Sequence, residues 1–384
     1  MALTVWLKAG YTVEVIERLA DEAQDELGES VTVEVVDEAT AHDGLVELAR
    51  KGEGPDIATV SFWYLPEYAA NGWIAPVAEV DPDIALDRYH PRAVEAMSFD
   101  GTLLGVPHTL IGGMLAARRD LLDGAGLAIP RGPEEICAAA AALARPARAG
   151  LVARGAPDFP SYGTFNGWAW AKGISLLDAP PDEAAEAIGD LVAALRDHGA
   201  PNAAAMGYEE AGAEVRTGRA AMIFDTSGWG NYFEDPARSS VTGRISYSVP
   251  WASRAAVQFP YSEGLAVMSW SPSKAAATRF LSWRHDERTL LRECLEQHRF
   301  DFPRTDLRDW SRVAEHADEL GLGEYLLALA ASWDAIALES FPVRTDFTEV
   351  GRAIMGAISG AIARTEPDLA DGIAQARHRA GLTA

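Results

Sequence analysis

The sequence predicts an α/β protein with two lobes, each assembled from separate stretches of the chain. Short apolar strand patterns alternate with helix patterns through the first third, which is typical of a parallel sheet covered on both faces. No proline- or serine-rich linker divides the 384 residues into consecutive domains. About 150 residues per domain would nevertheless give two to three domains, so we expect the chain to cross between lobes several times.

The first third predicts strands and helices in strict alternation, at residues 3–7, 12–27, 31–36, 41–50, 56–60 and 64–70. Thr12 can cap the first helix, whose apolar residues fall on one face. Open parallel sheets bind ligands at the carboxyl ends of their strands. Residues 8–11, 37–42 and 61–64 follow those ends, so we expect them at a ligand-binding edge.

The rest of the chain is mixed at first and then helical. Gly112 and Gly113 separate two strand patterns, at residues 101–108 and 114–117, and we expect a sharp bend or a lobe crossing there. Further strands are predicted at residues 150–154, 220–224, 244–249 and 264–270. Helices are predicted at residues 133–143, 161–172, 182–198, 208–217, 345–363 and 369–379.

Composition excludes several classes of protein. Lys and Arg number 33 against 57 Asp and Glu, a net charge of −24, which disfavours binding to nucleic acid and to anionic lipid headgroups. No apolar run is long enough to predict a transmembrane helix. The two cysteines, Cys137 and Cys294, cannot supply a four-ligand zinc site or a disulfide framework, and we expect two separate thiols.

Common catalytic motifs are missing from the sequence. It contains no phosphate-binding loop, no dinucleotide fingerprint, no His-Glu-x-x-His and no Gly-x-Ser-x-Gly. The eight histidines are isolated in the sequence, and only His108, at a predicted strand end beside the glycine pair, is retained as a site candidate. We therefore expect no enzymatic activity, no metal and no cofactor.

Aromatic residues at strand ends indicate a carbohydrate ligand. Trp63 follows the third strand, and Trp229 follows a later strand through Asp225, Thr226 and Ser227. Flat aromatic faces pack on the C–H faces of sugars, while carboxylates and hydroxyls hydrogen-bond sugar hydroxyls. Phe165 and Trp168 form another aromatic group with Trp170, but helical spacing leaves core packing open as the alternative for them.

Five motifs in order resemble the extracellular solute-binding proteins of ABC sugar importers, the maltose-binding-like family. They lie at residues 54–57 (GPDI) with 68–76, 100–107 (DGTLLGVP), 119–127, 218–222 (GRAAM) with Trp229, and 263–267 (EGLAV). Residues 154–157 look closest to members that handle polyols or plant and fungal sugars. The resemblance spans nearly the whole chain.

The resemblance implies a periplasmic-binding-protein fold with a ligand cleft between its lobes. Its lobes are expected at residues 1–109 plus 264–305 and at residues 110–263 plus 306–384. Family contacts fall on Lys8, Tyr11, Trp63, Trp229, Tyr261, Glu263 and Arg344. Trp63 and Trp229 would stack on the ligand, and Asp225, Glu263 and Arg344 would hydrogen-bond it. Lys8 and His108 would line the cleft.

The resemblance also implies a function. A neutral mono- or disaccharide or a polyol would favour the closed state of a hinge, and the closed protein would deliver it to membrane permease subunits. The protein is expected to be a monomer outside the cytoplasm, either periplasmic or a membrane-anchored lipoprotein, and the leader expected for such a protein is absent from this sequence. His108 and Trp63 stand where relatives have polar or acidic residues, which suggests a ligand different from maltose, or smaller.

Three alternatives remain open. The same fold could bind a polyamine, which the acidic charge would favour. It could bind a phosphorylated or sulfonated sugar through Arg154, Arg344 and the turn at residues 226–228. A glycoside hydrolase would instead need two opposed carboxyl groups in the crevice.

Overall fold

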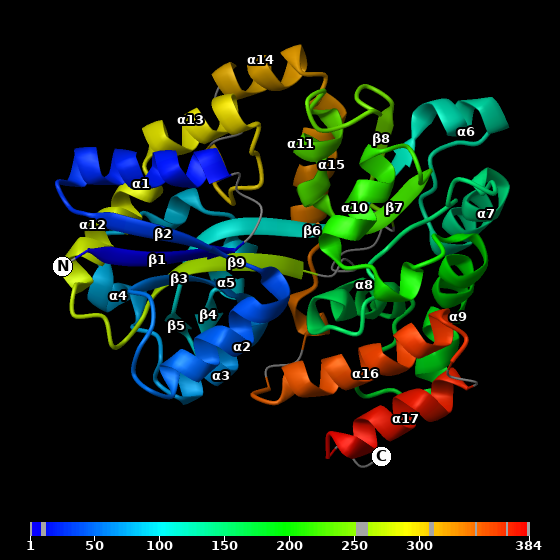
Figure 1. Ribbon diagram of the computed structural model, residues 1–384, viewed down its shortest axis with the longest axis horizontal. Coiled ribbons are helices and arrows are strands. Elements are labelled where there is room, and N and C mark those ends of the chain that lie inside the picture. The colour runs from blue at the N-terminus through cyan, green and yellow to red at the C-terminus, as the bar shows by residue number, and fades with distance from the viewer. Residues whose placement is uncertain are drawn as a thin grey trace. The chain divides into compact units, whose positions relative to one another are not determined.

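The computed structural model describes residues 2–8, 13–250, 260–306, 311–341, 344–365 and 368–381. The chain divides into two compact units whose segments interleave along the sequence. The first unit contains Met1–Leu110, Tyr261–Val313 and Val343–Thr345, and the second contains Ile111–Pro260, Ala314–Pro342 and Asp346–Ala384. Both units combine strands with helices (Figure 1). This confirms the predicted α/β class, while the predicted lobe boundaries stay a prediction.

The first unit is organised around three parallel strands and one antiparallel strand. β1 (Leu3–Lys8) lies between β2 (Val31–Val36) and β3 (Ile57–Ser61), and all three run in the same direction. β9 (Pro260–Val267) pairs antiparallel with β3, so Ser61 lies opposite Glu263. The parallel arrangement predicted for the first third is confirmed for β1, β2 and β3, and β9 adds an antiparallel neighbour from later in the chain. The antiparallel register brings a residue from late in the chain to the carboxyl end of β3.

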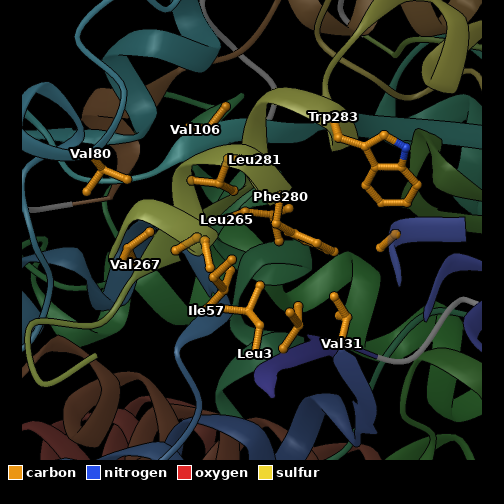
Figure 2. Packing of buried hydrophobic residues seen from close by; sticks show 14 of the residues in the cluster. Leu3, Val31, Ile57, Val80, Val106, Leu265, Val267, Phe280, Leu281 and Trp283 are labelled. Carbon is orange, nitrogen blue, oxygen red and sulfur yellow. The ribbon is translucent and has the colours of Figure 1, made fainter. Parts of the chain in front are cut away.

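Alternating side chains of β1 point to opposite faces of the sheet, as expected for a strand. Leu3, Val5 and Leu7 are buried against Leu19 and Ala23 of α1 (Val13–Leu27) in the main apolar cluster of this unit. Figure 2 shows part of the cluster, in which Phe280, Leu281 and Trp283 of α12 (Lys274–Arg284) lie near Leu3 and Val106. Lys8, on the other face, points toward α2 (Glu38–Ala49).

The remaining elements of the first unit are short, apart from α13. They are η1 (Phe62–Tyr64), α3 (Leu65–Ala70), α4 (Val77–Val80), η2 (Leu86–Arg88), α5 (Pro91–Ala96), β4 (Ser98–Phe99), β5 (Thr102–Leu103) and α13 (Glu287–Gln297). α14 (Ser311–Glu319) begins in the first unit and ends in the second.

In the second unit, helices surround a small antiparallel sheet. The second half of β6 (Val106–Arg118) pairs with β7 (Met222–Thr226) and with β8 (Ile245–Ser248). The helices of this unit are α6 (Arg119–Ala125), α7 (Pro133–Leu143), α8 (Phe159–Trp170), α9 (Pro181–His198), η3 (Ala203–Ala205), α10 (Tyr208–Arg216), η4 (Ser227–Trp229), α11 (Gly230–Glu234), α15 (Gly323–Asp334), η6 (Leu338–Ser340), α16 (Phe347–Ile362) and α17 (Leu369–Arg379).

Two strand predictions in the centre of the chain are wrong. β6 is one continuous buried strand through Gly112 and Gly113, not two strands joined at a bend. Gly112 is instead required by packing, because a Cβ there would lie 2.7 Å from the carbonyl oxygen of Ser332. The predicted strand at residues 150–154 is reduced to one isolated bridge, which joins Val152 to Ile223 of β7.

The two thiols are separate, as expected from the sequence. Cys294 is buried, and Cys137 is half-buried. Burial raises the pKa of the Cys137 thiol to about 11, so this side chain stays protonated at neutral pH.

Candidate functional site

Polar side chains from three strands of the first unit meet at the carboxyl ends of β1 and β3. The Lys8 ammonium lies 2.6 Å from Oε1 of Glu263 and donates a hydrogen bond to the hydroxyl of Ser61. Ser61 Oγ donates to the same Glu263 oxygen over 3.2 Å. All three residues are buried. Because a buried ion pair needs further hydrogen bonds to offset desolvation, this arrangement is a fixed network rather than a loose surface contact.

Tyr261 connects this network to an aromatic wall. Its hydroxyl lies 3.1 Å from Oε1 of Glu263 and also hydrogen-bonds the Glu38 carboxylate at the start of α2. Its ring meets Trp63 edge-on, with ring centroids 5.1 Å apart, and lies 5.9 Å from the Lys8 ammonium. The structure thus brings together four predicted site residues: Lys8, Trp63, Tyr261 and Glu263.

A small pocket opens beside this network, between α2 and the strand ends. Its lining includes Lys8, His42, Thr59, Ser61 and Tyr64. The pocket combines hydroxyls, a paired ammonium and aromatic surface, which are the groups that recognise hydroxyl-rich ligands. Ser61, His42 and Glu38 were not selected from the sequence, although they lie in the strand-end segments where a ligand edge was predicted.

His108 belongs to a different cluster of the first unit. It is buried in β6, where its ring packs edge-on against His285 and Phe302, and its Nε2 lies 3.3 Å from a guanidinium nitrogen of Arg299. Burial, with the nearby charge of Arg284, holds the pKa of His108 well below its usual value. The structure does not bring His108 to Lys8, and its contacts are those of a neutral core histidine.

In the second unit, the predicted strand-end residues follow β7. The Asp225 carboxylate accepts hydrogen bonds from Nε of Arg154 at 3.0 and 3.1 Å, and from the Thr226 backbone N–H at 2.7 Å. The Trp229 indole N–H donates to Asp225 over 3.4 Å. Ser227 Oγ accepts from the Gly112 backbone N–H. Asp225 therefore fixes the turn that carries Trp229.

Three flat groups are stacked at this turn. The Tyr208 ring lies on Trp229 with centroids 4.0 Å apart and 22° between the planes, and the Arg154 guanidinium covers Tyr208 at 4.6 Å. The Tyr208 hydroxyl and Thr226 Oγ1 both approach the space where a Cβ of Gly228 would lie, at 3.4 and 3.8 Å. Thr226 Oγ1 is buried without a hydrogen-bond partner. Sequence reasoning missed Tyr208, since it occupies an ordinary helix start.

Phe165 and Trp168 lie in the interior of the second unit. Both side chains are fully buried on α8. Trp168 donates to Asp190 of α9 over 2.8 Å and packs edge-on against Phe224. Core packing, the alternative left open by the helical spacing, accounts for these contacts.

Two more residues were predicted for the site, Arg344 and Tyr11. Arg344 is half-buried and belongs to the first unit. Tyr11 lies outside the described residues.

Neither a metal cluster nor a membrane span emerges from the described part of the chain. Within those residues, no three His, Cys, Asp or Glu side chains are grouped so that they could hold a metal ion. None of the helices described there is both long and apolar enough to cross a bilayer.

Comparison with known proteins identifies a family. The family model described as bacterial extracellular solute-binding protein matches residues 9–283. A mannitol-binding protein of Pseudomonas aeruginosa is 27% identical over 252 residues, which make up 62% of this chain and 57% of that relative. The match therefore covers less than two thirds of the relative's length.

Solved structures with similar folds match almost the full length of the chain. An ABC transporter solute-binding protein from Agrobacterium vitis S4 with bound D-mannitol is 19% identical, has a TM-score of 0.87, and covers 99% of this chain and 97% of that chain. A solute-binding protein from Agrobacterium radiobacter K84 in complex with ribitol is 22% identical, with a TM-score of 0.88 and coverage of 99% and 98%. These matches confirm the fold predicted from the sequence.

Proposed function

Because the chain belongs to the family of bacterial extracellular solute-binding proteins, we propose that it binds one small neutral carbohydrate or polyol and delivers it to the permease of an ABC importer. The ligand leaves unchanged, and the protein works as a monomer outside the cytoplasm. Relatives named for mannitol and ribitol support an open-chain polyol as the first ligand to test.

The observation that carries the proposal is the network around Glu263. Its carboxylate is within hydrogen-bonding reach of Lys8, Ser61 and Tyr261, beside the Trp63 ring. A ligand with several hydroxyls can donate to Glu263, accept from Lys8 or Ser61, and place its C–H face on the aromatic wall. In the second unit, Thr226, Tyr208 and Trp229 are the candidate contacts.

The charges near these residues favour a neutral ligand over an anion. Lys8 is paired with Glu263, and Arg154 is paired with Asp225. An anion would have to displace a buried carboxylate from its cation in either place, which is costly. Glu38 adds a second carboxylate beside Tyr261, so the first-unit network has more acidic than basic side chains. Polyamines are therefore included among the compounds to be tested.

A thermal-shift screen of ligand-stripped protein tests the proposal. The panel contains D-mannitol, ribitol, neutral mono- and disaccharides, sugar phosphates and polyamines. Ligand at 100 times Kd should stabilise the protein by about 2.7 kcal/mol. We expect a shift with a neutral polyol or sugar that is recovered unchanged. A shift with sugar phosphates or polyamines alone would reject the ligand class, and conversion to a product would indicate a hydrolase.

A further inference from the structure

His42 is a buried residue of α2 that contacts Tyr64, Glu67 and Tyr68, in the segment that follows Trp63. Its imidazole lies flat on the Tyr64 ring, with centroids 3.8 Å apart and 5° between the planes. Its Nδ1 lies 2.8 Å from the Tyr68 hydroxyl, and its Nε2 lies 3.2 Å from a carboxylate oxygen of Glu67. Tyr64 directly follows Trp63 in η1.

One arrangement of protons satisfies both ring nitrogens of His42. Tyr68 is 1% exposed, and burial raises the pKa of its phenol well above the usual value, so the hydroxyl keeps its proton. It can then donate to Nδ1 while Nε2–H donates to Glu67. With both nitrogens engaged in this way, His42 presents ring surface to the pocket rather than a hydrogen-bonding atom.

A second residue of α2 contacts another aromatic neighbour of Trp63. Glu38, one helical turn before His42 on the same face, accepts a hydrogen bond from Tyr261. Tyr261 in turn meets Trp63 edge-on. α2 therefore holds Tyr64 through His42 and Tyr261 through Glu38, and these two rings are neighbours of Trp63, with Tyr64 at a centroid distance of 6.0 Å.

We infer that His42 is a positioning residue, which fixes the Trp63 indole for ligand binding by stacking on Tyr64. The inference rests on the proposed function, because it makes affinity depend on the orientation of Trp63. The ring, rather than its polar contacts, carries this role. The polar contacts to Tyr68 and Glu67 contribute to the stability of the first unit.

Two variants separate the ring from its hydrogen bonds. His42→Phe keeps a flat ring on Tyr64 but removes both polar contacts, while His42→Gln keeps a donor toward Glu67 but removes the ring. We expect H42F to lower the free energy of unfolding and to bind ligand within about threefold of wild type. We expect H42Q to bind about tenfold more weakly, the upper range for one aromatic stack. Glu47→Ala, an exposed position of the same helix, is the control.

Affinity measured by calorimetry and unfolding by denaturant together decide the inference. Affinities of H42F and H42Q that merely follow their stabilities would overturn it, as would wild-type affinity in H42Q.

A readout that needs no ligand keeps the inference separate from the proposed function. The contribution of Trp63 to the near-UV circular dichroism is the difference between spectra recorded with and without Trp63→Phe in the same protein. This contribution should persist in H42F and fade in H42Q. Its persistence in both would overturn the inference even if no panel compound bound.

Discussion

Removing the Lys8 ammonium should destabilise the first unit strongly, because the buried Glu263 carboxylate would lose the cation paired with it. The two groups lie 2.6 Å apart, with side-chain exposures of 7% and 10%. Breaking a buried pair from one side costs about 3–5 kcal/mol. Ser61 would still donate to Glu263, so we place the cost of Lys8→Met at the lower end of this range, a loss of about 3 kcal/mol.

A double variant at Lys8 and Glu263 distinguishes the effect of an unpaired buried charge from the effect of a changed side-chain shape. Glu263→Met alone leaves a buried ammonium and should cost a similar amount, whereas Lys8→Met with Glu263→Met removes both charges. Replacing both members of a buried pair with apolar side chains is often close to neutral. We allow about 1 kcal/mol for the hydrogen bond that Ser61 loses, so the double variant should be more stable than either single one.

Equilibrium denaturation in guanidinium chloride measures these differences. The matched control is Lys51→Met, which breaks an exposed pair with Glu47 in the same unit, also at hydrogen-bond distance (3.0 Å). Exposed pairs contribute little to stability, so this control should unfold like wild type. If K8M destabilises the protein no more than K51M does, or if the double variant is less stable than both K8M and E263M, then the Lys8–Glu263 pair does not act as a buried ion pair.

Three further outcomes are expected. Trp63→Ala should weaken ligand binding by about 1–2 kcal/mol through lost stacking and apolar contact, measured by calorimetry, with the secondary structure unchanged by circular dichroism. Arg154→Met should lower the free energy of unfolding by about 3–5 kcal/mol, because it leaves the Asp225 carboxylate buried without its cation; a loss under 1 kcal/mol would contradict this. Burial and neighbouring charges lower the pKa of His285 to about 3 and hold that of His108 well below its usual value. A histidine kept neutral in the fold binds its proton only on unfolding, so stability should be full above pH 6.5 and fall below it. The loss at pH 5.5 should be about 1.4 kcal/mol per residue, measured by denaturation at both pH values, and it should halve in His285→Gln.

The parallel part of the first unit could be predicted from the sequence because its information is local. Short apolar runs mark β1 and β3, and an alternating pattern marks β2. The rule that ligands meet strand ends pointed to the segments holding Lys8 and Trp63. Ser61, Glu38 and His42 lie in the same predicted segments. The sequence did not show which residues of each segment point into the site, because that depends on the face of the strand or helix on which each side chain lies.

Local sequence patterns could not predict which strands far apart in the chain pair with each other, or in which register. Glu263 meets Ser61 only because β9 returns antiparallel to β3 after about 200 intervening residues, and the family resemblance, not periodicity, suggested its role. The same limit explains His108, which side-chain alternation along β6 turns toward Phe302. Helical spacing likewise could not tell whether Trp168 faced a ligand or the core.

We expect this chain to bind one small neutral polyol or sugar without changing it. Isothermal titration of D-mannitol and of ribitol into ligand-stripped protein, followed by chemical analysis of the recovered compound, decides whether it does. We predict saturable binding of one equivalent per chain and quantitative recovery of the starting compound. Binding that occurs only with charged compounds, or recovery of a cleaved or modified product, would contradict this prediction.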